Sequence, residues 1–135
     1  MTSFQTKSNL LPGTNYKEVY KRAIEIFKVI KHKTKRKPFI RAAYFKKDKI
    51  FFDYFWNHLR QKRYPDRTRR LKCFAATIDL LEHSRIKPDF VPNPLKKGET
   101  LYRFKGLTKE KTTFYVQIKE TKNGQKQLIS IFPGK

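Results

Sequence analysis

The chain has 135 residues, a length that can bury one hydrophobic core, and it predicts a single domain over residues 1–135. Its 33 Lys and Arg against 11 Asp and Glu give a formal net charge of +22, far above the magnitude of roughly 2–8 typical of a small soluble domain. Twelve Phe and seven Tyr exclude a disordered basic tail, so the composition predicts a folded protein with a polyanionic partner.

The sequence contains no pattern typical of export or membrane insertion. Residues 1–11 lack the apolar core of a signal peptide, and no stretch approaches the roughly 20 apolar residues of a membrane helix. Cys73 is the only cysteine, so no disulfide can form within the chain. These features predict a cytoplasmic protein without a membrane partner.

Residues 1–13 are polar and end in a Pro-Gly turn signal, so we expect a flexible arm. A helix should follow to about Lys33, because Thr14 or Asn15 can cap it and apolar residues recur at the helical period. The basic segment of residues 31–41 contains a proline and is expected to end this helix and form a connection.

Two more helices are predicted in the remainder of a helical half that spans residues 14–84. Large apolar groups crowd residues 47–61, which indicates a helix buried on more than one side. Asp66 can cap a third helix, whose apolar residues recur at the spacing of one buried face. Residues 85–99 hold three prolines and a glycine and predict an extended link.

Three strands are predicted near the C-terminus, over residues 100–106, 112–120 and 126–132. Apolar and polar residues alternate along them, as in a sheet buried on one face, and Asn123 with the glycine after it is a strong hairpin signal. The fold class expected is therefore α+β: about three N-terminal helices packed on one face of a small antiparallel sheet of three to four strands within residues 100–135.

In the last strand, the alternation predicts that Ile129 and Ile131 face the helices, while Leu128, Ser130 and Phe132 face solvent. This assignment depends on the strand register, because a slip of one residue moves every side chain to the opposite face.

If the three strands are neighbours, one exposed face gathers Arg103, Tyr115, Gln117, Lys119 and Ser130. Arginine offers a planar fork to phosphate oxygens, lysine a point charge, and serine or glutamine can orient a hydroxyl. Such a set can hold an RNA backbone while its own 2′-hydroxyl attacks the adjacent phosphorus, without a metal. A solvated antiparallel face is also commonly polar, so an ordinary surface explains the same pattern.

Clustered cations elsewhere predict contacts to a phosphate backbone. The residues assigned to nucleic-acid binding are Lys35, Arg36, Lys37, Arg41, Arg63, Arg67, Arg70, Lys105 and Tyr115. No metal or other cofactor is expected, because acidic residues are scattered, the histidines lack zinc-ligand spacing and no phosphate-binding glycine loop is present. His58 is expected to have a structural role.

The C-terminal part, over about residues 83–133, resembles a superfamily of small ribonucleases and toxins that includes barnase, colicin E5, colicin D and RelE. The resemblance rests on the segments LYRFKG, TFYVQIK and LISIFP, at residues 101–106, 113–119 and 128–133. It implies a metal-independent endoribonuclease in which Arg103 and Lys119 stabilise the phosphate and Ser130 supplies a hydroxyl. The general base is left unassigned, with His83 as a candidate.

Three interpretations therefore remain open. The leading one is an RNA-binding, metal-independent endoribonuclease, with RNA favoured over DNA; as a toxin it would have an acidic antitoxin or inhibitor as its protein partner. The second is a non-catalytic, basic nucleic-acid-binding protein. The third, an adaptor for an acidic protein, explains the charge but assigns no role to the hydroxyl and amide side chains.

Overall fold

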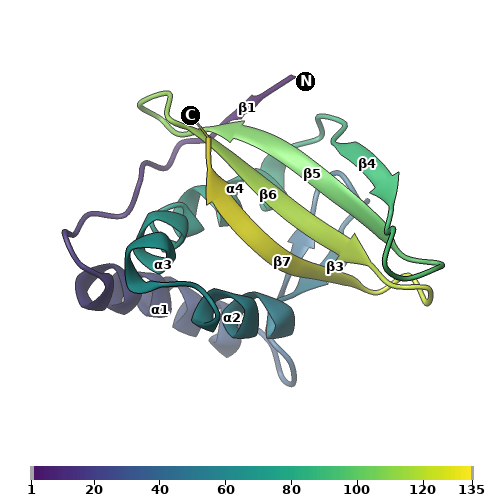
Figure 1. Ribbon diagram of the computed structural model, residues 1–135, viewed down its shortest axis with the longest axis horizontal. Coiled ribbons are helices and arrows are strands. Elements are labelled where there is room, and N and C mark those ends of the chain that lie inside the picture. The colour runs from purple at the N-terminus through teal and green to yellow at the C-terminus, as the bar shows by residue number, and fades with distance from the viewer. Residues whose placement is uncertain (1, 135) are drawn as a thin grey trace.

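The computed structural model describes residues 2–134, in which four helices and seven strands are found. In chain order they are β1 (Phe4–Gln5), α1 (Tyr16–His32), β2 (Phe39–Ala42), β3 (Asp48–Phe51), α2 (Asp53–Arg60), α3 (Tyr64–Leu71), α4 (Phe74–His83), β4 (Asp89–Pro92), β5 (Thr100–Leu107), β6 (Thr113–Glu120) and β7 (Lys126–Pro133). The long strands β5, β6 and β7 face the viewer in Figure 1, and the helices lie below and behind them.

All seven strands belong to one curled, mixed sheet. Its order is β1-β5-β6-β7-β3-β2, and β4 pairs with the first half of β5. The β1–β5 and β3–β7 pairs are parallel, and the other pairs are antiparallel. The expected antiparallel sheet of three to four strands is therefore wrong, because segments from the N-terminal half and the proline-rich link add strands on both sides of it.

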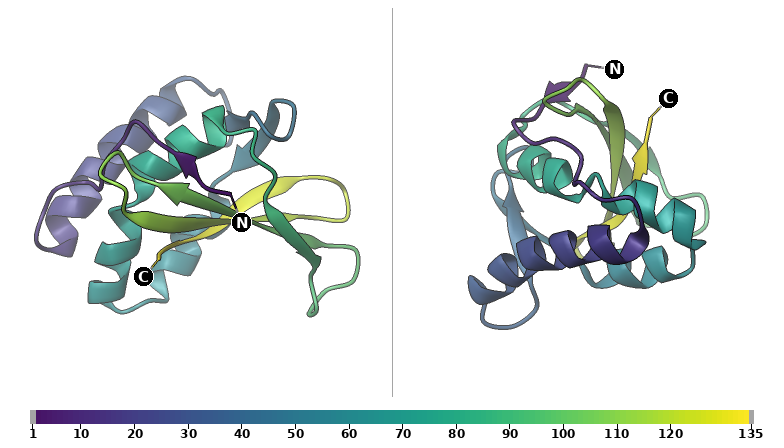
Figure 2. Two further views of the ribbon diagram at one scale, coloured as in Figure 1. Left: turned by 90° about the horizontal axis from the view of Figure 1, so that it is seen from above. Right: turned by 90° about the vertical axis from the view of Figure 1, so that its left-hand side faces the viewer.

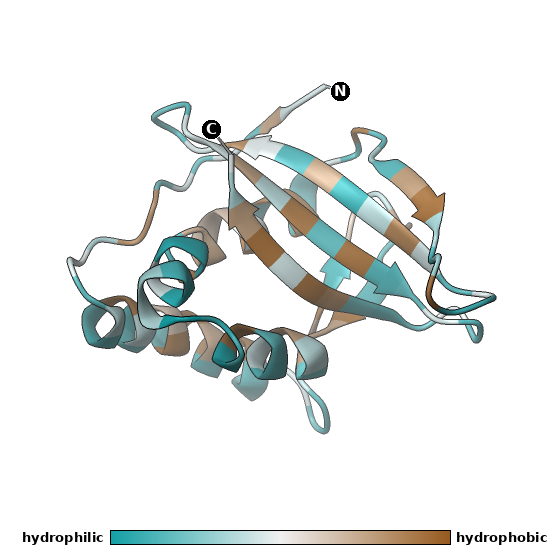
Figure 3. Ribbon diagram, in the orientation of Figure 1, coloured by the Kyte–Doolittle hydropathy of each residue, from teal (hydrophilic) through white to brown (hydrophobic). Residues whose placement is uncertain are grey.

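The three strands predicted from alternation are present as β5, β6 and β7, and they are neighbours as expected. Gly124, in the turn between β6 and β7, has a φ of 86°, which suits a glycine in a tight hairpin. Figure 3 shows hydrophobic and hydrophilic residues alternating along β6. Local patterning was sufficient for β5 and β6 because their buried residues lie on one face, whereas the first three residues of β7 are all buried.

The segment expected to be a second helix contains β3 followed by α2. Its apolar run joins two patterns: Ile50 and Phe52 are buried at the strand period, and Phe55 and Leu59 at the helical spacing of four. Ile50 pairs with Ile40 of β2, a contact that lies outside the local sequence. Two short periodic patterns placed end to end resembled one crowded helix.

The first predicted helix is confirmed as α1, and the side-chain oxygen of Asn15 caps it by accepting a hydrogen bond of 3.0 Å from the backbone N–H of Glu18. The third predicted helix is divided into α3 and α4. Helix α4 packs against β2, β5 and α1, which is why most of its side chains are buried.

The segment expected to be a loose arm is instead bound to the body of the protein. It contributes β1 beside the end of β5, and the N–H of Thr6 donates to the carbonyl of Leu107 at 2.7 Å. The N–H of Lys7 donates to the Asp79 carboxylate at 2.7 Å. Figure 2 follows this segment from β1 to the start of α1.

A β-bulge in β7 changes which of its side chains reach the core. Gln117 pairs with Ser130 and Ile118 with Leu128, so Ile129 is an extra residue in β7. Leu128 is fully buried and Ile131 is 1% exposed, whereas Ile129 is only half-buried. The expected inward position of Ile129 and outward position of Leu128 are therefore wrong, because the bulge shifts the alternation by one residue.

Within residues 2–134, no helix combines the length and the apolar character needed to cross a membrane.

Candidate nucleic-acid interface

The predicted site residues on the sheet do share one face. The register places Arg103 opposite Gln117, and Gln117 opposite Ser130, in a single cross-strand row. The neighbouring rows are Lys105, Tyr115 and Phe132 on one side, and Leu101, Lys119 and Gln127 on the other. We call these three rows the outer face; they point away from the buried Phe104, Val116 and Ile118.

Two aromatic rings and a guanidinium lie together on the outer face. The rings of Tyr115 and Phe132 have centroids 5.3 Å apart and planes inclined by 24°, which is a stacked arrangement. The guanidinium carbon of exposed Arg103 lies 5.2 Å from the centroid of Phe132. Phe132 was expected to point outward, but no role was predicted for it. Its contact with Arg103 joins β7 to β5 across β6, and no pattern within one strand indicates such a contact.

The ammonium of Lys119 is less accessible to a ligand than its predicted place on a solvated face suggested. Its ammonium lies 4.2 Å from the centroid of the Tyr54 ring in α2 and 3.9 Å from a carboxylate oxygen of Glu99. The Lys119 side chain is 19% exposed, and Glu99 is buried. This end of the outer face is therefore partly covered by α2, and no local pattern predicted that Glu99 would lie there.

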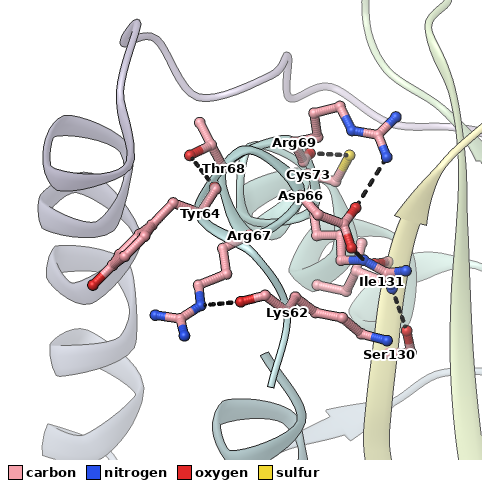
Figure 4. Close-up of polar contacts among 10 residues, drawn as sticks. Lys62, Tyr64, Asp66, Arg67, Thr68, Arg69, Cys73, Ser130 and Ile131 are labelled. Atoms are coloured by element: carbon pink, nitrogen blue, oxygen red, sulfur yellow. Dashed lines mark hydrogen bonds and ion pairs between the residues drawn. The ribbon is translucent and has the colours of Figure 1, made fainter. Parts of the chain in front are cut away.

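Ser130 is bonded to α3. Within residues 2–134, β3 pairs with only Lys126 and Gln127 of β7, so the following part of that β7 edge has no strand beside it. Arg70 occupies this edge: its Nη1 donates to Ser130 Oγ at 2.9 Å and to the carbonyl of Ile131 at 3.2 Å. Figure 4 shows α3 beside β7 with these bonds between them.

Asp66 fixes the position of Arg70. Its carboxylate accepts hydrogen bonds from Arg70 at 3.0 Å and from Arg69 at 2.9 Å (Figure 4). Burial alone would raise the pKa of Asp66, but these hydrogen bonds outweigh it and hold the pKa below the ordinary value of 3.8. Arg70, predicted as a phosphate contact, is thus already held by a carboxylate and by the edge of the sheet.

His58 of α2 lies closer to the sheet site than the sequence indicated. It lines a small hollow of about 10 Å³ together with Arg70 and Ser130, which leaves room for roughly one water molecule. Burial, with the nearby charges of Lys62 and Arg70, lowers the pKa of His58 below 6.5, so the neutral imidazole predominates at pH 7. A neutral imidazole can accept a proton.

His83, the base candidate suggested by the resemblance, lies elsewhere. Its Nδ1 is 2.8 Å from the Asp79 carboxylate, and its ring lines a hollow formed by the β2–β3 turn and the end of α4. Arg41 lines the same hollow, and no residue of the outer face does. Proximity to the strands in sequence did not bring His83 to the site, because α4 packs on the other side of the sheet.

The remaining predicted binding residues fall into two groups. Lys35, Arg36 and Lys37 are exposed between α1 and β2, where the ammonium of Lys37 lies 3.2 Å from the Asp53 carboxylate. Arg67 donates to the backbone carbonyls of Lys62 and Arg60 and joins α2 to α3, which gives it a structural role. Arg63, at the start of α3, is exposed.

Comparison with known protein families, with curated proteins and with solved structures finds no match to this chain. Within residues 2–134, no three His, Cys, Asp or Glu side chains are grouped as metal ligands would be. Inferences about function therefore depend on the chemistry of the outer face and its surroundings.

Proposed function

We propose that the protein binds single-stranded RNA across the outer face of β5, β6 and β7. The observation that carries the proposal is the stacked pair of Tyr115 and Phe132 with the guanidinium of Arg103 over Phe132. Unpaired bases stack on aromatic and guanidinium planes, and this binding tolerates many sequences. Lys105 lies beside Tyr115 in the same row and can contact phosphate.

The geometry favours a single strand over a duplex. Only splayed bases can lie flat on rings that project from a sheet, whereas bases within a duplex are stacked on one another. Gln117 lies between Arg103 and Ser130 and is half-buried, so its amide can both donate to and accept from a 2′-hydroxyl. This supports a preference for RNA over DNA.

A matched pair of strand variants tests the stacking role. Phe132→Thr removes the ring from the outer face and keeps a residue that favours strands, so binding should weaken by about 5- to 100-fold, as expected from roughly 1–3 kcal/mol per stacked base. Phe90→Thr is the control, because Phe90 is a 55% exposed strand residue outside the outer face. The measurement is fluorescence anisotropy with a labelled single-stranded RNA of mixed sequence.

Unchanged affinity in Phe132→Thr, or an equal loss in both variants, would reject the proposed surface. Single-stranded DNA and double-stranded RNA of the same length serve as competitors. Both should compete less well than the single-stranded RNA.

A metal-independent endoribonuclease is the second candidate, favoured by the row of Arg103, Gln117 and Ser130 with His58 beside Ser130. In this reaction His58 takes the proton of the 2′-hydroxyl as its oxygen bonds to the adjacent phosphorus. The bond from phosphorus to the 5′-oxygen breaks, this oxygen leaves as a hydroxyl with a proton taken from solvent, and a 2′,3′-cyclic phosphate remains. Arg103 stabilises the added negative charge on the phosphate oxygens.

Incubation of the protein with single-stranded RNA in EDTA tests this second candidate. It predicts fragments with cyclic phosphate ends, and it predicts that His58→Gln and the Arg103→Ala, Lys119→Ala double variant stop cleavage while Phe90→Thr does not. Tight RNA binding without fragments would leave binding as the function of the outer face. Cleavage that persists in the double variant would place any activity elsewhere.

A further inference from the structure

The far edge of β2 has no strand partner. Strand β2 is the last strand of the sheet order, and within residues 2–134 it pairs only with β3. In an antiparallel strand, every second residue directs its N–H and C=O groups away from the neighbouring strand. Just beyond β2 the N–H of Ala43 donates to the carbonyl of Leu81 at 3.0 Å, so α4 meets the edge at that end.

Three open hollows adjoin β2: two lie along its far edge and the turn that follows it, and one crosses the face of the β2–β3 hairpin toward Gln125. The first, about 600 Å³, lies between the segment after α1 and the β2–β3 hairpin, and the last, about 910 Å³, lies beside the β2–β3 turn. Between them a hollow of about 630 Å³ lies against α1, α4 and β2. Lys33 and Phe39 line both the first and the middle hollow, and Arg41 and Glu82 line both the middle and the last. We call this continuous depression the edge groove.

The middle of the edge groove is aliphatic. Its lining includes Ile26, Val29 and Ile30 of α1, Ile40 of β2 and Ile78 of α4. Val29 is 54% exposed, although the next residue of α1, Ile30, belongs to the core. An added outermost strand could pair with the unpaired edge of β2 and cover this aliphatic strip.

Both ends of the edge groove are cationic. The lining cations are Lys33, Lys35, Arg36, Lys37 and Lys49 at one end, and Arg41, Lys46, Lys47 and Arg85 at the other. The turn holds Lys46 and Lys47 at φ of 55° and 70°, a left-handed conformation that lysine rarely adopts, and Arg41 donates to the carbonyl of Lys47 at 3.1 Å. Glu82 is the one carboxylate in the lining of these three hollows.

We propose that the edge groove binds an extended protein segment with an apolar middle and acidic ends, which adds to the sheet as a strand beside β2. Backbone groups of the segment pair with the free edge, its apolar side chains cover Val29 and Ile26, and its carboxylates meet the lysines and arginines at the two ends. A nucleic acid fits less well, because the isoleucine and valine side chains in the middle of the edge groove offer no stacking plane to its bases.

The edge groove and the outer face have no residue in common, so this inference is independent of the proposed RNA binding. The probe is a short fluorescent peptide with alternating valine and threonine in the middle and aspartates at both ends. Anisotropy is measured at physiological salt, where weak attraction between distant exposed charges is screened. Saturable binding is expected, and no displacement by single-stranded RNA.

Two valines with equal exposure provide the matched variants. Val29 and Val91 are each 54% exposed, so Val29→Lys and Val91→Lys add the same charge at comparable sites, inside and outside the edge groove. At physiological salt, an extra lysine adds only a weak, non-specific attraction for an acidic peptide in either variant. We expect Val29→Lys instead to weaken binding by about tenfold or more, because it places a charge against the apolar middle of the peptide, and Val91→Lys to leave it unchanged.

A second peptide with N-methyl groups on alternate backbone amides has the same charge and side chains but cannot pair as a strand on its modified edge. It should not bind. Absence of binding by the unmodified peptide, equal binding of the two peptides, equal affinity of the two lysine variants, or displacement by RNA would each overturn the proposal.

Discussion

Gly106 of β5 lies against Leu80 of α4 and the ring of Phe114. A Cβ at this position would overlap the ring of Phe114 and lie 2.8 Å from a methyl carbon of Leu80. Its backbone conformation is ordinary, so the absence of a side chain, rather than conformational freedom, explains the glycine. The requirement comes from residues that are distant in sequence or on another strand, and the sequence analysis assigned Gly106 no role.

Gly106→Ala should therefore destabilise the protein by about 1–3 kcal/mol, the usual cost of overpacking a core. Urea denaturation measures the free energy of unfolding. Adding Phe114→Leu to Gly106→Ala makes room for the methyl group, so the double variant should be more stable than the sum of the two single changes predicts. Strict additivity would show that Phe114 is not the obstacle.

At the residue scale, His58 and Ser130 show that tertiary packing can bring together site residues that no local pattern connects. Ser130 was expected on the exposed face from the alternation of its strand, whereas His58 was expected to be structural. They line the same hollow because α2 packs along the β7 edge. No local pattern in the sequence connects residues so far apart along the chain.

At the scale of elements, α3 closes the free edge of β7 through Asp66 and Arg70. The guanidinium of Arg70 replaces a missing strand by donating to the carbonyl of Ile131, and Asp66 keeps it in place. An unpaired edge carbonyl in a partly buried position would otherwise be costly. The bulge at Ile129 lies in the same part of β7 and turns Leu128 into the core.

Asp66→Asn should lower the free energy of unfolding at pH 7 by about 1–2 kcal/mol, because Arg70 and Arg69 lose charged hydrogen-bond acceptors. The pKa of Asp66 is lower in the folded state, so its stabilising effect is complete above the unfolded value of about 3.8 and is lost as the pH falls through the folded value. The difference between wild type and variant should therefore vanish at low pH.

Urea denaturation from pH 7 to pH 2 measures this difference. Glu25→Gln is the control, since Glu25 is exposed on α1 and should contribute little at any pH. A loss of stability in Asp66→Asn that stays constant down to pH 2 would contradict the assigned role of the carboxylate.

At the scale of the whole molecule, the net charge of +22 is distributed over distinct surfaces. The outer face carries Arg103 and Lys105 beside aromatic rings, whereas the edge groove has cations at its two ends and an aliphatic middle. One polyanion attracted by charge alone would not need both arrangements. The two proposed partners, an unpaired nucleic acid and an acidic protein segment, would each use one of these arrangements.

The dependence of RNA binding on salt tests this division of charge. Each phosphate contact on a single strand contributes about 0.7 to the slope of log affinity against log salt, so Arg103→Ala with Lys105→Ala should reduce that slope by about 1.4. The control is Lys21→Ala with Arg22→Ala, which removes the same charge from the exposed side of α1 and should leave the slope almost unchanged. Equal reductions would mean that RNA responds only to net charge.

Composition and local periodicity were enough to predict the charge, the helix α1 and the strands β5, β6 and β7 with most of their exposed face. These features depend on composition, or on a repeat of two or nearly four residues that can be read within one segment. Asn15 caps α1 and Gly124 lies in a tight turn, and the residues around each position were enough to predict these features. The row of Arg103, Gln117 and Ser130 also follows from alternation once neighbouring strands are paired.

Packing between distant segments, by contrast, brings β1, β2, β3 and β4 into the same sheet, places the bulge of β7 at Ile129, and brings Arg70 and His58 to Ser130. A strand of two to four residues has little periodicity of its own, and its partner lies elsewhere in the chain, in parallel pairs above all. The free edge of β2 exists for the same reason: it is a property of the order of strands, which is set by packing between distant segments.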